Sequence, residues 1–354
     1  MTALPSSVLL QATLVAVLRG LLLIYILFFV SCSRQESSRM EYALGTFCTV
    51  TLFEQGNNRI YNEIFSRLHE IENLMSVNIP SSDISRINAA AGIEPVYVHE
   101  DTFRVIERAV YFARLTGGAF DPTVGALVSL WDIGGANQRV PSQEEIDKVL
   151  PLVNWRGIEL NAGERSVFLA RTGMALDMGA IAKGFAADEI SVILISNKID
   201  RAIIDLGGDI ITHGTRADRS PWRIGIQYPF EGRGTTIGFI QVREKTVVTS
   251  GIYKQFFEVD GIRYHHLFTP SQGFPGKPGF PAQTGLLSVT LITDVSMDAD
   301  ALSTAIFVMG YERGMALLRH LPEIDAVFVF EDNSIRTTPG ANFTLTDRSF
   351  RLIN

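Results

Sequence analysis

Apolar residues recur at helical spacing in several parts of the chain. In the range 58–75 they return every three or four residues, which places their side chains on one face of an α-helix. These residues are Ile60, Ile64, Leu68, Ile71 and Met75. Ser142 and Glu145 form a capping box that opens a short helix. Together the patterns predict helices over 58–75, 100–115, 142 onward, 181–195 and 300–318.

A second pattern predicts strands. Residues 46–53 (TFCTVTLF) are rich in β-branched and aromatic residues, which favour strands. Between 202 and 293, short apolar runs are separated by glycine, asparagine or charged pairs. These runs are AIIDL, WRIGIQY, TIGFIQV, TVVTS, QFFEV, YHHLF and LLSVTLI. Helices early and late in the chain, with strands between them, predict an α+β fold. Because no Pro/Ser-rich linker divides the chain, we expect a single compact unit.

A long apolar segment lies near the N-terminus. Residues 20–31 form an apolar run that is preceded by the positive charge of Arg19 and followed by Cys32. A positive residue, a short apolar run and a small residue follow one another in this order in a secretory signal. Ser31 before Cys32 resembles a bacterial lipobox, in which the cysteine is lipidated. The alternative is an uncleaved membrane span over 8–30, disfavoured by the charge of Arg19 within it. We therefore expect a signal peptide at 1–31, a lipidated tether at 32–40 and a folded domain at 41–354. The protein would then be anchored to the inner membrane in the bacterial periplasm.

The composition excludes several classes of protein. The 354 residues are 46% hydrophobic and 19% charged, as in folded proteins. A formal charge of −7 argues against nucleic-acid binding, which needs a basic face. The two cysteines, Cys32 and Cys48, are too few for a cysteine-based zinc site or a disulfide framework. If Cys32 is lipidated, Cys48 has no partner, and its apolar neighbours predict that it is buried and inert.

Segment 116–123 (TGGAFDPT) follows a predicted helix. Gly117 and Gly118 would let a ligand approach the main chain, and Phe120 places an aromatic ring beside Asp121. The alternative is a helix C-cap followed by a turn.

Segment 176–184 (LDMGAIAKG) places Asp177 at the end of a strand and Lys183 in the first turn of a helix. Amide groups at a helix start attract phosphate, and the lysine adds a positive charge. Because lysine is otherwise unfavourable there, the segment favours anion binding over a merely solvated lysine.

Two weaker segments lie in the strand-rich region. The first, 204–209 (IDLGGD), has two carboxylates flanking a glycine pair and is explained by a tight strand connection. The second is TSGIY at 249–253, which leads to YHHLFTP at 264–270. In a strand, His265 and His266 face opposite sides, so at most one of them serves a given pocket.

Segment 298–304 (DADALST) opens the last predicted helix. Asp300 and Thr304 lie one turn apart on one face. With a backbone carbonyl they offer the hard oxygen atoms that Mg²⁺ prefers. The alternative is that Asp298 caps the helix and Asp300 complements its dipole.

Taken together, these segments suit a nucleotide diphosphate. Amides near Lys183 would bind phosphate, Asp300 and Thr304 would hold Mg²⁺, and His266 could act as a base. The metal would neutralise the pyrophosphate and assist attack at phosphorus.

The same segments, in this order, resemble the ApbE family of FAD:protein FMN transferases, periplasmic lipoproteins that attach FMN to Thr or Ser of target proteins. The resemblance runs from about Leu44-Gly-Thr46 to Gly310. The matching blocks are TGGAFDPTVG, LDMGAIAKG, LGGDI, TSGIY, YHHLFTP and DADALSTAIFVMG. The resemblance implies a T-fold-like core with an added α/β part, and Mg²⁺-dependent transfer of FMN from FAD with release of AMP.

The resemblance also implies roles for particular residues. The implied FAD contacts are Asn78, Ala119, Phe120, Asp121, Asp177, Lys183 and Leu267. The implied Mg²⁺ ligands are the main-chain oxygen of Ala180 with Asp300 and Thr304. His266, in the block H-[IL]-x-x-P, would take the proton of the acceptor hydroxyl, and Asp300 would complete the catalytic pair.

Two positions depart from the family pattern. Leu44 replaces the usual methionine, a swap of similar volume. Asn78 stands where many members have a tyrosine that could stack on FAD. A looser site could admit water, so we expect FAD hydrolysis to FMN and AMP as a second activity.

Other functional classes predict different features. A non-catalytic FAD carrier would not need His266 or the pair Asp300 and Thr304. A solute-binding component of a transporter predicts two similar lobes, and the sequence has no such duplication. The chain has no segment like the acceptor motif Asp-x-x-Ser/Thr-Gly-Ala-Thr. We therefore expect the acceptor to be another exported protein, for example an electron-transport subunit of the Rnf or Nqr kind.

Overall fold

The computed structural model describes residues 37–53, 58–232, 234–271, 274 and 276–353. The predicted signal peptide and Cys32 lie outside these residues. The described elements belong to one compact unit, residues 38–354. Within the described ranges, every helix is too short or too polar to cross a lipid bilayer.

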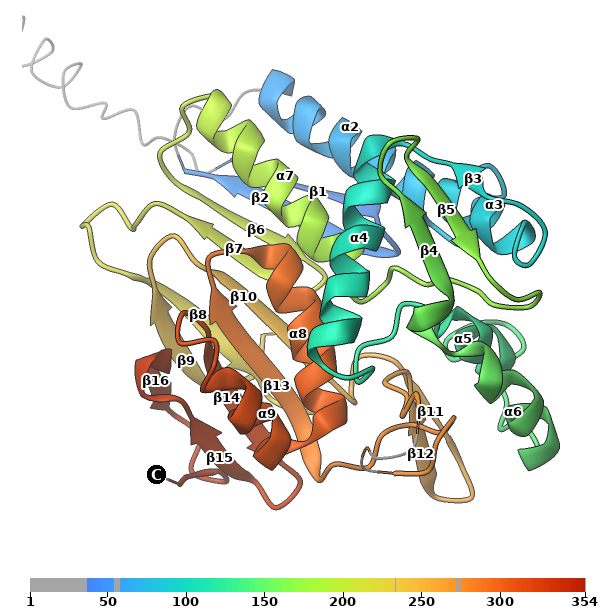
Figure 1. Cartoon of the computed structure of the whole chain (residues 1–354). Helices are drawn as coiled ribbons and strands as arrows, with labels where there is room; N and C mark the ends of the chain where they lie inside the picture. The colour runs from blue at the N-terminus through green and yellow to red at the C-terminus, as the bar shows by residue number, and fades with distance from the viewer. Residues whose placement is uncertain (1–36, 54–57, 233, 272–273, 275, 354) are drawn as a thin grey trace, which may run out of the picture. The chain divides into compact units, whose positions relative to one another are not determined.

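The predicted α+β class is confirmed (Figure 1). The helices are α2 Asn58–Met75, α3 Asp83–Ala89, α4 Glu100–Leu115, α5 Gly125–Trp131, α6 Gln143–Val149, α7 Ala182–Ser196, α8 Ser296–Met309 and α9 Tyr311–Leu318. The strands are β1 Ser37–Ala43, β2 Thr46–Leu52, β3 Val96–Tyr97, β4 Ile158–Asn161, β5 Ser166–Leu169, β6 Ala202–Leu206, β7 Ile210–His213, β8 Trp222–Gln227, β9 Thr236–Val242, β10 Thr246–Gly251, β11 Phe256–Val259, β12 Ile262–His265, β13 Leu286–Thr293, β14 Asp325–Phe330, β15 Ser334–Thr337, β16 Phe343–Leu345 and β17 Arg351–Leu352.

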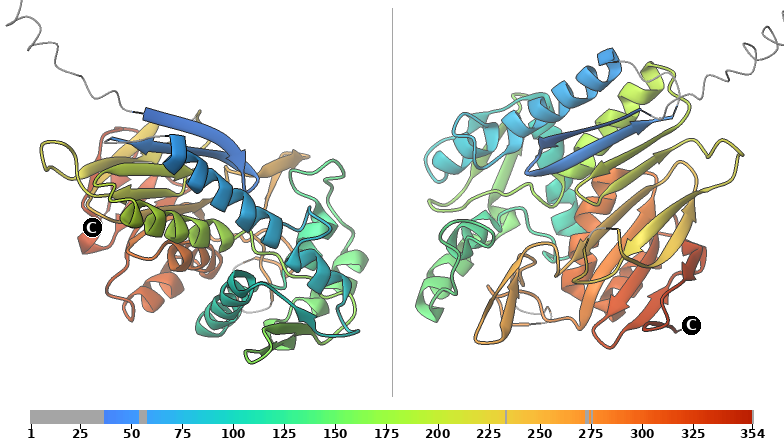
Figure 2. Two further views of the ribbon diagram at one scale, coloured as in Figure 1. Left: turned by 90° about the horizontal axis from the view of Figure 1, so that it is seen from above. Right: turned by 180° about the vertical axis from the view of Figure 1, so that it is seen from behind.

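A nine-stranded sheet forms the centre of the fold, in the order β1-β2-β6-β7-β10-β13-β14-β15-β17. Strand β13 is buried at every position, as expected for a strand covered on both faces. Helices α2, α7 and α8 cover one face, and the small sheet β16-β9-β8 lies toward the other, as the views of Figure 2 show. Cys48 in β2 is fully buried, as predicted, and burial raises the pKa of its thiol to about 12.

The last predicted helix, 300–318, is wrong as a single element. The chain forms α8 and α9, separated by Gly310 with φ 76°. This left-handed conformation is open to glycine and ends α8 there. The apolar pattern runs through both helices and therefore gave no sign of the break.

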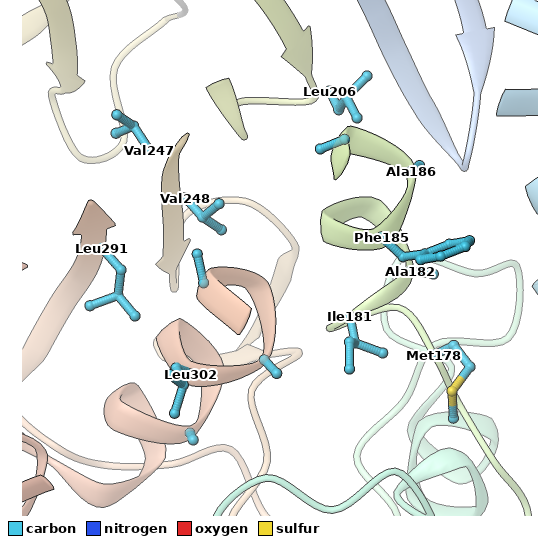
Figure 3. Packing of buried hydrophobic residues seen from close by; sticks show 14 of the residues in the cluster. Met178, Ile181, Ala182, Phe185, Ala186, Leu206, Val247, Val248, Leu291 and Leu302 are labelled. Atoms are coloured by element: carbon cyan, nitrogen blue, oxygen red, sulfur yellow. The ribbon is translucent and has the colours of Figure 1, made fainter. Parts of the chain in front are cut away.

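Helices α7 and α8 cross in close contact at Gly184. A Cβ atom at this position would lie 2.3 Å from the main-chain oxygen of Ser296, so only glycine permits the approach. Around the crossing, Ala182 and Phe185 of α7, Leu302 of α8 and Val248 of β10 belong to the same hydrophobic core (Figure 3). The crossing brings the first turn of α7 beside the first turn of α8, and the carboxylate of Asp300, further along α8, reaches the amide of Gly184.

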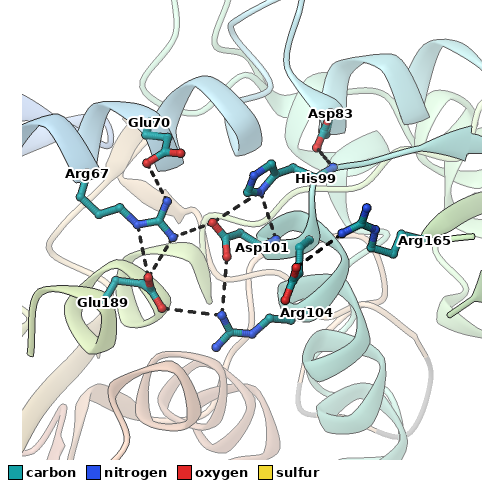
Figure 4. A network of polar contacts seen from close by, with 9 residues as sticks. Arg67, Glu70, Asp83, His99, Asp101, Arg104, Arg165 and Glu189 are labelled. Atoms are coloured by element: carbon teal, nitrogen blue, oxygen red, sulfur yellow. Dashed lines mark hydrogen bonds and ion pairs between the residues drawn. The ribbon is translucent and has the colours of Figure 1, made fainter. Parts of the chain in front are cut away.

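An ion-pair network joins α2, α4 and α7 (Figure 4). Arg67 of α2 lies 2.5 Å from Asp101 of α4 and 2.8 Å from Glu189 of α7. Only 17% of the Arg67 side chain and 9% of the Asp101 side chain are exposed. Burial opposes the charge of Arg67, but its hydrogen bonds to carboxylates raise its pKa above the ordinary value.

We expect Arg67→Met to lower the free energy of unfolding by about 3 kcal/mol, because it removes the nearest cation of the buried Asp101 and leaves Arg104, at 3.5 Å, as a more distant one. Urea denaturation measures the change. Lys148→Met is the matched control, because the pair of Lys148 with Glu144 is exposed on α6. It should change stability by less than about 0.5 kcal/mol. Equal losses in the two variants would contradict the structural role of the Arg67 network.

Candidate functional site

Three of the predicted segments meet around the ammonium group of Lys183. Its Nζ atom lies 2.8 Å from Asp209 Oδ2, and 3.1 and 3.3 Å from the two carboxylate oxygens of Asp300. Lys183 is in the first turn of α7, Asp300 is in α8, and Asp209 lies in the turn between β6 and β7. Lys254, just after β10, brings a second ammonium group to 3.5 Å from Asp209.

The four groups form a half-buried cluster of alternating charge. The side chains of Asp209 and Asp300 are 3% and 5% exposed, and those of Lys183 and Lys254 are 23% and 25% exposed. Burial opposes ionisation of Asp209, but the two lysines lower its pKa. Burial raises the pKa of Asp300 against the effect of Lys183. Burial also disfavours the charge of Lys183, yet the two carboxylates raise its pKa.

The oxygen atoms around Lys183 fit the predicted Mg²⁺ site. Besides Asp300 and Asp209, the carbonyl of Gly179, next to Ala180, lies 3.5 Å from Lys183 Nζ. The hydroxyl of Thr304 lies 3.2 Å from that of Ser250 in β10, one helical turn from Asp300. A carboxylate, a hydroxyl and carbonyls of the turn at 179–180 are the hard donors that Mg²⁺ prefers. A metal bound to Asp300 would have to displace the ammonium of Lys183.

The alternative for Asp298, helix capping, is wrong. Helix α8 begins at Ser296, and its first amides, those of Ser296 and Met297, donate to Asp188 of α7. Asp298 instead pairs with Arg108 of α4. Asp300 therefore lies past the first turn, and its carboxylate accepts a hydrogen bond of 3.0 Å from the amide of Gly184.

The loop after α4 is held by its own polar groups. The carboxylate of Asp121 accepts hydrogen bonds from the amide and hydroxyl of Thr123 and from the amide of Trp155. Ala119 and Phe120 are each only 3% exposed, with their side chains in the core. The loop is therefore buried and internally hydrogen-bonded, and it does not present an aromatic ring beside a free carboxylate. The amide of Gly118 bonds to the carbonyl of Ala113, so the glycines also end α4, as the C-cap alternative predicts.

Asp177 links this loop to the start of α7. Its amide donates to the carbonyl of Pro122 at 2.9 Å, and its carboxylate accepts from the amide of Gly179 at 2.7 Å. Burial raises the pKa of Asp177 against that hydrogen bond. The predicted FAD loop and the predicted phosphate-binding turn are therefore directly joined.

The two histidines have different surroundings. His265, at the end of β12, is 6% exposed, and its ring bonds to the carbonyl of Ala282 and the amide of Leu267. His266 lies just beyond the strand, and its Nδ1 is 3.1 Å from the carbonyl oxygen of Gln255. Because a carbonyl oxygen only accepts, Nδ1 carries the hydrogen and Nε2 keeps its lone pair. Burial lowers the pKa of His266 to about 4, and Lys254 and Lys183 add to the effect.

The remaining predicted positions are more dispersed. Leu267 is buried, with 4% of its surface exposed. Asn78 is exposed in the turn after α2, where its main-chain amide donates a hydrogen bond to the hydroxyl of Ser76. Leu44 forms the turn between β1 and β2 with φ 53°, an uncommon conformation for leucine.

Sequence reasoning missed three residues at this site: Asp209 and Lys254 of the charged cluster, and Ser250, which contacts Thr304. Asp209 stands in a segment interpreted as a tight strand connection, and the other two lie in or beside TSGIY. The available signal was the recurrence of charged or hydroxyl residues at strand ends. Their contact with Lys183 and Thr304 depends on strand order, which periodicity does not reveal.

Comparison with known proteins places this geometry in a family. The ApbE family model matches residues 44–328. A FAD:protein FMN transferase of Treponema pallidum is 40% identical, covering 86% of this chain and 88% of its own length. One of Klebsiella pneumoniae is 37% identical, covering 77% of this chain and 83% of its own length.

Solved structures agree with this result. The ApbE protein of Thermotoga maritima has a TM-score of 0.76 at 34% identity, covering 88% of this chain and 97% of its own. The flavin transferase ApbE of Vibrio cholerae has a TM-score of 0.74 at 28% identity, and the match covers 89% of this chain and 98% of the other. These matches confirm the predicted ApbE-like fold in a single unit. The chain belongs to the ApbE family.

Proposed function

We propose that this protein transfers FMN from FAD to a Ser or Thr hydroxyl of another protein and releases AMP, in a Mg²⁺-dependent reaction. The observation that carries the proposal is the placement of His266, with Nε2 available, near a cluster of two lysines and two aspartates. The names of the curated relatives support the substrate and the acceptor class.

The cation of the reaction would be held by Asp300, Thr304 and the main-chain oxygen of Ala180. Bound Mg²⁺ supplies charge neutralisation at the pyrophosphate of FAD. Lys183 and Lys254 are paired with Asp209 and Asp300, so the four groups are formally neutral on their own. With Mg²⁺ bound, the site would carry the excess positive charge that favours a diphosphate over a neutral ligand.

His266 would handle the proton of the acceptor. The hydroxyl oxygen attacks the phosphorus of the FMN half, and the bond from that phosphorus to the bridging oxygen breaks. The hydroxyl proton passes to Nε2 of His266, and AMP leaves with the bridging oxygen. The hydrogen bond from Nδ1 to Gln255 orients the ring, and the low pKa keeps it neutral and able to accept the proton at physiological pH.

We also propose FAD hydrolysis as a second activity of the same site, because Asn78 cannot stack on the isoalloxazine ring as tyrosine can. We expect Asn78→Tyr to slow acceptor-free release of AMP and to tighten FAD binding by about 0.5 to 1.5 kcal/mol. Chromatography and fluorescence titration measure the two effects. The control is Asn137→Tyr, because Asn137 is also an exposed asparagine. Asn88 does not serve as a control, because its side chain accepts a hydrogen bond from the amide of Leu176. Unchanged hydrolysis in Asn78→Tyr would contradict the role of Asn78.

We also propose where the protein lies in the cell. Lipidation at Cys32 would hold the protein at the inner membrane, with the domain in the periplasm. The acceptor would then be an exported protein, such as a subunit of an Rnf- or Nqr-type complex. The lipobox-like sequence before Cys32 supports this placement.

The direct test follows FMN and AMP in the purified protein incubated with FAD. The incubations contain or omit Mg²⁺ and a peptide with the motif Asp-x-x-Thr-Gly-Ala-Thr. We expect AMP release that requires Mg²⁺, with FMN bonded to the peptide, and slower release without peptide. FAD that stays bound and intact in every incubation would instead support the non-catalytic carrier.

A further inference from the structure

Three hydroxyl groups lie in a row beside the predicted Mg²⁺ ligands. The Oγ1 atom of Thr304 is 3.2 Å from Oγ of Ser250, which is 2.8 Å from Oγ of Ser303. The hydroxyl of Ser303 is in turn 3.0 Å from the main-chain carbonyl oxygen of Asp300. We call Thr304, Ser250 and Ser303 the hydroxyl chain. It begins at one predicted ligand and ends on the main chain of the other.

The acceptor at its end fixes the direction of each hydrogen bond in the hydroxyl chain. A carbonyl oxygen only accepts, so Ser303 donates its single hydroxyl hydrogen to Asp300. Ser303 then has no hydrogen left for its contact with Ser250, and Ser250 is the donor there. For the same reason, Ser250 accepts from Thr304 in the next contact. The hydroxyl hydrogen of Thr304 therefore points to Ser250.

This direction prepares the hydroxyl of Thr304 for a cation. A hydroxyl binds a metal ion through an oxygen lone pair, so its hydrogen has to point away from the metal. Because the hydrogen of Thr304 is committed to Ser250, both lone pairs of its oxygen remain available. In the reverse direction, Thr304 would accept from Ser250 and lose one of these lone pairs, and its own hydrogen would be free to turn towards the metal.

The two serines are held in regular elements away from solvent. Ser250 lies in β10, between β7 and β13 in the nine-stranded sheet, and is 8% exposed. Ser303 lies in α8 and is fully buried. Thr304, also in α8, is more exposed than either serine, as a residue that meets a cation from solvent has to be. The packing of α8 on β10 thus sets the position of the Thr304 hydroxyl.

A second hydroxyl contact in the same sheet offers a comparison. Thr249, next to Ser250 in β10, has its Oγ1 atom 2.8 Å from that of Thr290, its register partner in β13. Because successive side chains of a strand face opposite sides, this pair lies on the other face of the sheet. It joins two strands, whereas the hydroxyl chain joins a strand to the helix that carries the predicted ligands.

We propose that Ser250 and Ser303 are positioning residues of the metal site, which orient the hydroxyl of Thr304 so that a lone pair faces Mg²⁺. Ser250 acts through its hydrogen bond with Thr304, and Ser303 acts through Ser250. The inference rests on the proposed function, because it takes Thr304 as a ligand of the cation in that reaction. It adds two residues that support this ligand without binding the metal themselves.

The first test is Ser250→Ala, which removes the acceptor and lets the hydroxyl of Thr304 turn. We expect the dissociation constant of Mg²⁺ to rise about ten- to hundred-fold, the usual effect of losing a residue that orients a metal ligand. Calorimetric titration of the protein with Mg²⁺ alone measures this constant without FAD or transfer. The control is Thr290→Val, which removes a hydrogen-bonded hydroxyl on the other face of the sheet and should keep the wild-type Mg²⁺ affinity.

Ser303→Ala tests the direction of the hydroxyl chain. Without Ser303, the hydrogen of Ser250 loses its acceptor and is free to turn to Thr304. The Mg²⁺ affinity should therefore fall here too, by a smaller factor than in Ser250→Ala. The double variant should match Ser250→Ala alone, because Ser303 acts only through Ser250. If the two losses multiplied in the double variant, the proposed order of the hydroxyl chain would be wrong.

Two results would overturn the inference as a whole. One is an unchanged Mg²⁺ affinity in Ser250→Ala. The other is an equal loss in Thr290→Val, which would assign the effect to general loosening of the sheet. A wild type that binds Mg²⁺ but transfers no FMN would contradict the proposed function alone, and the affinities of the variants would still decide the role of Ser250. A wild type that binds no Mg²⁺ would contradict both.

Discussion

Replacing His266 with asparagine should lower FMN transfer by about 10²- to 10⁴-fold, the range of a lost general base. The asparagine amide can still donate to the carbonyl of Gln255, as Nδ1 of the imidazole does, so the local structure is kept. What disappears is the lone pair of Nε2 that accepts the acceptor proton. FAD affinity should stay unchanged, because the residue acts on the hydroxyl and not on the nucleotide. Peptide flavinylation and FAD fluorescence quenching measure the two quantities.

The control for this variant is His213→Asn, since His213 also bonds to a main-chain carbonyl, that of Ile199, but lies in β7 outside the cluster. It should transfer FMN at the wild-type rate.

The pH dependence gives a second readout. Because the pKa of His266 is lowered to about 4, the ring is neutral above that value. Transfer should therefore lose the contribution of His266 only as the pH falls towards about 4. A wild-type rate in His266→Asn would exclude the histidine as base.

Asp300→Asn should abolish the Mg²⁺ dependence and lower transfer by at least about 10²-fold, because a neutral amide is a poor substitute for a carboxylate ligand. The fold should persist, since asparagine keeps the shape and Lys183 keeps its ion pair with Asp209. Calorimetric titration with Mg²⁺ alone gives a readout that does not depend on activity, and we expect its heat of binding to be lost.

Asp298→Asn is the matched control for Asp300→Asn. Asp298 lies two residues earlier on α8, and its partner is Arg108 rather than Lys183. This variant should keep both Mg²⁺ binding and transfer. If Asp300→Asn retained Mg²⁺-dependent transfer, the metal site would have to lie elsewhere in the chain.

Local patterns predicted most of the secondary structure. Helices α2 and α4 have the predicted bounds, because their apolar periodicity is regular along one face. The capping box of Ser142 and Glu145 formed as predicted, since both of its hydrogen bonds are local. The break at Gly310 was missed, because α8 and α9 are both apolar and one glycine within such a run is a weak signal.

The candidate site was predicted only in part, because its contacts connect distant segments. Its helix position alone predicts that Lys183 binds an anion, but two carboxylates from other elements surround its ammonium group. The sequence predicts that Phe120 offers an aromatic face beside a carboxylate, yet the loop turns the ring into the core. Such outcomes depend on the order of strands in the sheet and on the crossing of α7 with α8, which no short pattern encodes.

The most direct test of the central claim is the mass of an acceptor peptide after incubation with the wild-type protein, FAD and Mg²⁺. We predict a mass gain equal to FMN minus water on the Ser or Thr residue, with one AMP released for each peptide modified. An unmodified peptide alongside intact FAD, at protein and Mg²⁺ concentrations that saturate binding, would contradict the account.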